Sequence, residues 1–105
     1  MNNAAKDCRI DIWLWRARFF KTRSLAARMV SEGCVKLARG GVETLIDKPS
    51  RTVHCGDGLI VVVGARRATL KIEALGTRRG PAPEARALYS MAKGWTPTGA
   101  EFPWG

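Results

Sequence analysis

Acidic residues, cysteine and long apolar runs are all scarce in this 105-residue chain. It has 9 Asp and Glu against 18 Lys and Arg, so its formal net charge is +9. The longest apolar candidate, Leu59–Val63, is far shorter than the roughly 18 residues of a membrane helix, and the N-terminus lacks the apolar stretch of a signal peptide. Three cysteines are an odd number, which argues against a secreted disulfide framework. We expect a small, basic, cytoplasmic protein that makes no membrane contact.

Signatures of catalysis and of metal binding are also missing. The chain has no P-loop, no nucleophile elbow and no dinucleotide fingerprint. Its soft metal ligands, Cys8, Cys34, Cys55 and His54, do not have zinc-site spacing. Asp11 has no nearby histidine or second acid for acid–base work, and we expect it in an ion pair with an arginine. The prediction is a non-enzymatic protein without metal or cofactor.

Positive charge is abundant near the N-terminus. Residues 9–28 contain six basic side chains against one acid, a local net charge of +5. Arginine outnumbers lysine there, which suits forked recognition of phosphate oxygens. A solvated face without a partner usually mixes charges of both signs, and this one barely does. The pattern favours a polyanion as partner, RNA ahead of duplex DNA.

Two helices are predicted in this basic stretch. Apolar residues recur at helical spacing over Arg9–Phe20. A break follows, and Thr22 is a suitable N-cap for a second helix over Arg23–Glu32. Gly33 is well placed to end that helix in a left-handed conformation. The segment therefore predicts a helical hairpin.

Two tryptophans lie in the first predicted helix. Trp13 is on the apolar stripe and is expected in the core, whereas Trp15 points to another side of the helix. For Trp15 we favour packing under the C-terminal segment over stacking on a nucleotide.

Most of the remainder of the chain is predicted to form strands. The run 59–63 is β-branched and continuous, which is typical of a buried central strand. A further helix is predicted over Pro83–Met91, and the last dozen residues have no regular pattern. Strands are predicted at 34–37, 42–47, 51–54, 59–63 and 68–75, with turns at 39–41, 56–58 and 64–67.

A family resemblance rests on these motifs. The basic helical run with Trp13-Leu14-Trp15 and Lys21-Thr22-Arg23-Ser24, followed by Val30-x-x-Gly33-x-Val35, resembles the RNA-binding domain named after small-subunit ribosomal protein S4, the alpha-L motif. Together with Lys48-Pro49-Ser50, Gly56-Asp57 and the segment 78–89, it is similar to the heat shock protein 15 family of ribosome-associated proteins. The resemblance covers about residues 9–90.

The resemblance implies an α+β fold, with a helical hairpin packed on a small, mostly antiparallel sheet. It implies an S4-type domain over 9–75 and a C-terminal extension over 76–105, with a short helix and an irregular tail. It also implies non-catalytic binding of ribosomal RNA on the large ribosomal subunit. The family acts when a nascent chain remains attached to transfer RNA, and helps to recycle such stalled subunits.

The predicted RNA surface is the helical hairpin and the strand that follows it. Phosphate is favoured at the start of the second helix, where backbone amides and the helix dipole add to the side-chain charge. The predicted RNA-binding residues are Arg9, Arg16, Arg18, Lys21, Thr22, Arg23, Arg28 and Lys36, with Lys48 and Arg51 near the edge.

The chain departs from the family pattern at two places, and two other functions stay open. Many relatives have an Asn-Gly turn where this chain has Arg39-Gly40-Gly41, so we expect a longer or looser hairpin. Some relatives end in a long basic helix, which the segment from Ser90 onward lacks.

The alternatives are an accessory module of an RNA-modifying enzyme acting in trans, and a protein–protein adaptor that uses exposed tryptophans.

Overall fold

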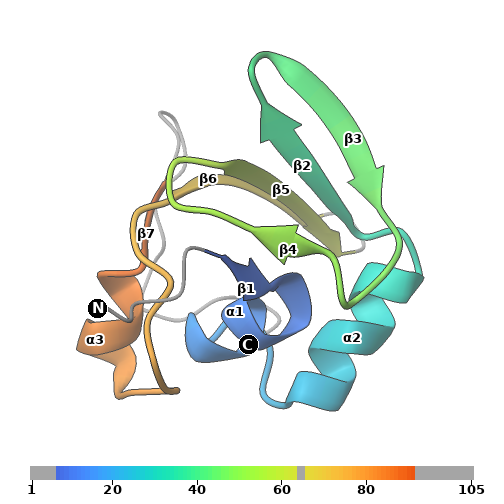
Figure 1. Cartoon of the computed structure of the whole chain (residues 1–105). Helices are drawn as coiled ribbons and strands as arrows, with labels where there is room; N and C mark the ends of the chain where they lie inside the picture. The colour runs from blue at the N-terminus through green and yellow to red at the C-terminus, as the bar shows by residue number, and fades with distance from the viewer. Residues whose placement is uncertain (1–6, 64–65, 92–105) are drawn as a thin grey trace.

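A five-stranded antiparallel sheet forms the centre of the fold, with α1 and α2 on one of its faces (Figure 1). The computed structural model describes residues 7–63 and 66–91. In spatial order the sheet contains β3 (Val42–Ile46), β2 (Val35–Arg39), β5 (Gly58–Val63), β6 (Arg66–Ile72) and β7 (Tyr89–Met91), and a second sheet pairs β1 (Cys8–Arg9) with β4 (Thr52–Val53).

The predicted α+β class is confirmed. All five predicted strands occur, with their ends shifted by up to three residues, and β5 is the central strand. Of the turn predicted at 64–67, residues 64–65 lie outside the described residues, and Arg66 and Arg67 already belong to β6, so the turn prediction is wrong there. The predicted irregular tail of the last dozen residues lies outside the described residues.

Alternation along the strands separates a core face from an outer face. Val35 and Leu37 of β2 lie opposite Val61 and Leu59 of β5, and all four are buried in one cluster with the helices. Lys36 lies between them in the sequence and is exposed, because successive side chains of a strand point to opposite faces.

The helix α2 (Arg23–Ser31) begins and ends where its caps predict. The Oγ1 of Thr22 accepts a hydrogen bond from the Leu25 backbone N–H at 3.0 Å. Gly33 has a φ of 85°, and the backbone N–H groups of Gly33 and Cys34 bond back to carbonyls of the last turn. This is a Schellman ending, so the prediction is confirmed to within one residue.

The first helix is shorter than predicted. Helix α1 covers Ile10–Arg16 and does not continue to Phe20, because Arg18 has a left-handed φ of 64° that reverses the chain. The reversal puts Phe19 into the core, fully buried beside Trp13, with ring centroids 5.9 Å apart. Phe19 and Phe20 extend the apolar pattern past the end of α1 because both side chains are buried in the core, although neither residue is helical.

The predicted helix over Pro83–Met91 is wrong beyond Arg86. Helix α3 covers only Ala82–Arg86, and β7 then pairs with β6 at the edge of the sheet. Tyr89 has its ring centroid 5.0 Å from that of Phe19 in the core. The ladder partner on β6 and this aromatic contact, both distant in sequence, override the local helical preference.

The prediction of a longer or looser hairpin after β2 is also wrong. Arg39 pairs directly with Val42, so Gly40 and Gly41 form a two-residue turn. Their φ angles are 60° and 82°, and positive φ at both positions is the requirement of the tight turn that matches strand twist. Two glycines satisfy that requirement as well as Asn-Gly does.

The left-handed Arg18 yields a stability prediction. A non-glycine residue at this φ carries a cost of about 1–2 kcal/mol, which glycine avoids. Both Arg18→Gly and Arg18→Ala remove the same side chain. We therefore expect Arg18→Gly to be about 1 kcal/mol more stable than Arg18→Ala in urea unfolding. Equal stability of the two variants would contradict the assigned backbone conformation.

Candidate nucleic-acid interface

Nine of the ten predicted RNA-binding residues are cations, and they lie in three different environments. Some are exposed without an ion pair, some are paired with a carboxylate, and some are bound to backbone carbonyls. The first group is Lys21, Arg23, Lys36, Lys48 and Arg51, the second is Arg9 and Arg28, and the third is Arg16 and Arg18, while the Thr22 hydroxyl caps α2.

Two exposed cations flank the N-terminus of α2. Lys21 and Arg23 stand on either side of the capping residue Thr22, and within the described residues neither forms an ion pair or a side-chain hydrogen bond. The first turn of a helix also has backbone N–H groups without intrahelical acceptors. Charge and donors therefore coincide at this helix end, as an anion requires.

Two more exposed cations belong to the loop between β3 and β4. The backbone N–H of Ile10 donates to the Arg51 carbonyl at 2.8 Å, and that of Asp11 donates to the Pro49 carbonyl at 3.4 Å. The loop thus accepts hydrogen bonds from the start of α1, and this fixes Lys48 and Arg51 beside that helix.

Lys36 is separate from both pairs. It lies opposite Leu45 on β3 and Ile60 on β5, on the outer face of the sheet. The structure brings Lys48 and Arg51 close to α1 but puts Lys36 on the face away from the packed helices.

Two of the predicted cations are engaged in ion pairs. Arg9 contacts Asp11 through two hydrogen bonds of 3.1 and 2.9 Å, which confirms the predicted role of Asp11. Arg28 contacts Glu32 at 3.0 Å one helical turn away. The Arg28 pair is solvent-exposed, and such pairs contribute little free energy, so Arg28 can leave it for a phosphate at small cost.

Arg16 and Arg18 bind the backbone that follows β6. Nη1 of Arg16 donates to the carbonyls of Gly76 at 3.0 Å and Leu75 at 3.4 Å. Nε of Arg18 donates to the Gly80 carbonyl at 2.7 Å. These two side chains hold residues 75–80 against the α1 region.

Arg79 completes this contact from the opposite side, and sequence reasoning missed it. Its Nε donates to the Trp15 carbonyl at 3.0 Å, and its guanidinium lies 6.0 Å from the Trp15 ring centroid. Burial, and secondarily the charge of Arg18, lowers the pKa of Arg79. We call Arg16, Arg18 and Arg79 the arginine clamp.

The packing interpretation of Trp15 is confirmed, and Trp13 is fully buried with its Nε1 donating to the Ala74 carbonyl at 2.9 Å.

A second unpredicted cluster joins the β2–β3 hairpin to the turn before β5. Arg39 contacts the buried carboxylate of Asp57 through two hydrogen bonds of 2.9 and 2.7 Å. The backbone N–H of His54 donates to the same carboxylate at 2.7 Å, and Arg39 Nη2 lies 2.9 Å from His54 Nδ1. Burial disfavours the charged form of Asp57, but the Arg39 and His54 hydrogen bonds outweigh it and hold the pKa of Asp57 below its ordinary value.

The lowered pKa of Asp57 predicts a pH dependence of stability. A carboxyl with a depressed folded-state pKa stabilises the fold above its ordinary pKa of 3.8, and this contribution is lost as the pH falls through the folded value. The free energy of unfolding of the wild-type chain should therefore exceed that of Asp57→Asn most at neutral pH. The difference should shrink when urea unfolding is repeated from about pH 6 down to about pH 3. A difference independent of pH would show that Asp57 is not the titrating group.

The described residues show neither a membrane span nor a metal site. No helix among them is long and apolar enough to cross a bilayer. Likewise, residues 7–63 and 66–91 contain no group of three or more side chains placed to hold a metal ion.

Known proteins are similar to this chain in sequence and in structure. A family profile described as the S4 domain matches residues 8–38. The heat shock protein 15 homolog of Haemophilus influenzae is 37% identical over 101 residues, which are 96% of this chain and 73% of that relative. The chain belongs to the heat shock protein 15 family.

Other members of the heat shock protein 15 family agree. Heat shock protein 15 of Escherichia coli K12 is 39% identical over 85 residues, which are 81% of this chain and 60% of that relative. The solved heat shock protein 15 of Vibrio cholerae, described as trimeric, has a TM-score of 0.72 and 40% identity over 83% of each chain. The S4 domain is an RNA-binding domain, so the predicted fold and the predicted class of partner are both supported.

Proposed function

We propose that this chain binds ribosomal RNA on the large ribosomal subunit in the bacterial cytoplasm. Its role would be the recycling of stalled subunits whose nascent chain is still attached to transfer RNA, with transfer RNA as a second possible contact. Membership of the heat shock protein 15 family and the S4 domain support the proposal, and so does the net charge of +9.

The observation that carries this proposal is the pair of unengaged cations at the start of α2. Lys21 and Arg23 stand beside a capped helix end whose first-turn amides point outward. A phosphate seated there would receive hydrogen bonds from the amides and charge from both side chains. Such contacts set the orientation and affinity of an RNA more than its sequence.

The remaining predicted residues contribute in different ways. The clamp arginines Arg16 and Arg18 face carbonyls, which carry no net charge, so their positive field still attracts RNA. Arg28 can exchange its exposed partner for a phosphate. Lys36, Lys48 and Arg51 would extend contact along a folded RNA, whose shape rather than base sequence is recognised.

Charge reversal at the start of α2 tests the proposal. Lys21→Glu/Arg23→Glu should weaken binding to large subunits and to RNA hairpins by at least about tenfold. The slope of log K against log salt should also fall by about 2, since two phosphate contacts are lost. Sedimentation with purified subunits and fluorescence anisotropy with labelled RNA measure the two quantities.

A matched control keeps the same change in charge on another surface. Arg67→Glu/Lys71→Glu places two acids on the outer face of β6, where both native side chains are exposed. We expect it to retain more binding than the α2 variant. If the control loses binding and the α2 variant keeps it, the interface is the sheet face. If duplex DNA competes as well as hairpin RNA, the partner class is wrong.

A further inference from the structure

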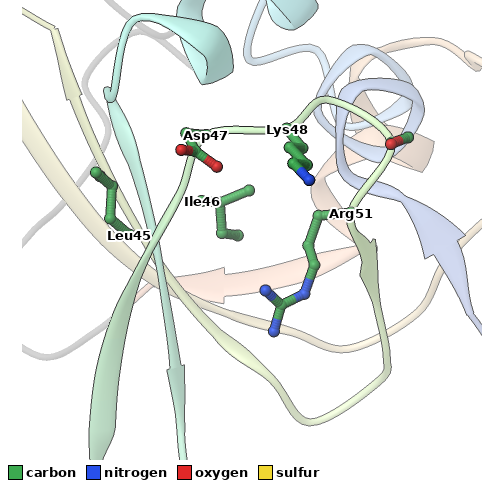
Figure 2. A pocket seen from close by; sticks show the side chains of 6 residues that line it. Leu45, Ile46, Asp47, Lys48 and Arg51 are labelled. Carbon is green, nitrogen blue, oxygen red and sulfur yellow. The ribbon is translucent and has the colours of Figure 1, made fainter.

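A small cavity opens beside the loop between β3 and β4. Its volume is about 250 Å³, and Figure 2 shows the nitrogen atoms of Lys48 and Arg51 directed into the space between the end of β3 and the start of β4. It is lined by Leu45, Ile46, Asp47, Lys48, Ser50 and Arg51.

Neither cation of this cavity forms an ion pair within the described residues. Asp47 stands on the same rim, yet among the described residues neither Lys48 nor Arg51 lies within ion-pair distance of a carboxylate. Two cations that line the same cavity favour an anion seated between them. Ser50, whose hydroxyl can donate a further hydrogen bond, also lines the cavity.

The other residues that line the cavity have a different chemistry. Leu45 is 51% exposed and is one of two large apolar side chains exposed in the described part of the chain. Beside it, the carboxylate of Asp47 can only accept hydrogen bonds when it is charged. The acceptor and the two cations together match the amino group of a nucleobase and its phosphate.

The backbone holds this arrangement before any ligand arrives. The Arg51 N–H donates to the Lys48 carbonyl at 2.9 Å and closes the turn. The Arg51 and Pro49 carbonyls are in turn bound by the first amides of α1. A loop fixed in this way loses little conformational freedom on binding.

We infer that this cavity receives one unpaired nucleotide of a folded RNA, with the phosphate between Lys48 and Arg51 and the base edge toward Asp47. The inference rests on the proposed function and names a structural feature of its RNA. A duplex keeps its bases stacked, whereas an extruded nucleotide presents a phosphate and a free base edge together. Bases with an exocyclic amino group are preferred over uracil, because that group donates to Asp47.

The geometry also limits where the unpaired nucleotide can stand. The cavity adjoins the C-terminal end of α2, where Gly33 lies close to the Leu45 side chain. The nine residues of α2 separate it from Lys21 and Arg23 by roughly 14 Å. While a phosphate of the same RNA is bound at the start of α2, a bulged nucleotide can enter the cavity only if it lies at that distance from the phosphate along the duplex.

The test uses a series of RNA hairpins in which one bulged nucleotide is moved along the stem, compared with the fully paired hairpin. One position should bind the wild-type chain about tenfold more tightly than the paired hairpin. 2-Aminopurine at that position should change its fluorescence on binding, and a uracil bulge should bind more weakly than cytosine there. Lys48→Gln/Arg51→Gln should lose the preference, so that the bulged and the fully paired hairpins bind this variant with equal affinity.

Carboxylate variants separate recognition of the base from general charge. Asp47→Asn should reduce the discrimination between cytosine and uracil, whereas Glu43→Gln, an exposed carboxylate on β3 outside the cavity, should preserve it. Equal affinity for every bulge position and for the paired stem would overturn this inference alone. Failure to bind any of the hairpins would overturn the proposed function instead.

Discussion

Charged guanidinium groups that donate to backbone carbonyls join the α1 region to the segment that follows β6. Arg16 and Arg18 reach from the end of α1 to residues 75–80, and Arg79 reaches back to the carbonyl of Trp15. Hydrogen bonds with a charged donor are stronger than neutral ones. Arg18, which takes part in this contact, also forms the left-handed turn, and the buried Phe19 follows it directly. The segment that the arginines bind leads from β6 to its partner strand β7.

The arginine clamp changes how the net charge of the chain is understood. Residues 9–28 contain six basic side chains. Arg16 and Arg18 donate hydrogen bonds to backbone carbonyls of the protein. Arg9 and Arg28 form ion pairs with carboxylates. Lys21 and Arg23 keep their donors for a partner. A basic segment can thus serve folding and binding at once, because neutral carbonyls satisfy hydrogen bonds without cancelling charge.

The sequence predicted the features that depend on near neighbours. Thr22 and Gly33 marked the ends of α2 because capping is decided within a few residues, and 59–63 marked the central strand because its apolar run is continuous. The early end of α1 and the strand at Tyr89–Met91 depend on partners some 60 residues and about 20 residues away, such as Gly80 for Arg18 and β6 for β7. Local periodicity carries no information about such contacts.

The candidate interface was predictable in composition but not in arrangement. The basic character of residues 9–28 was evident, whereas the division into clamp, ion-paired and free cations required coordinates. Arg79 gave no signal beyond its place in Arg-Arg-Gly-Pro. The extended segment 76–91 packs into the same core as the rest through Leu88 and Tyr89, while the division of the chain at residue 75 stays a prediction.

Arginine Nε–H resonances, followed by nuclear magnetic resonance during titration with a ribosomal RNA hairpin, test the account most directly. The account predicts that the Arg23 resonance and the first amides of α2 shift with RNA. The Arg18 and Arg79 resonances should stay in place and remain protected from exchange with solvent. Loss of that protection on binding, with an unchanged Arg23, would contradict the separation of a folding clamp from a binding surface.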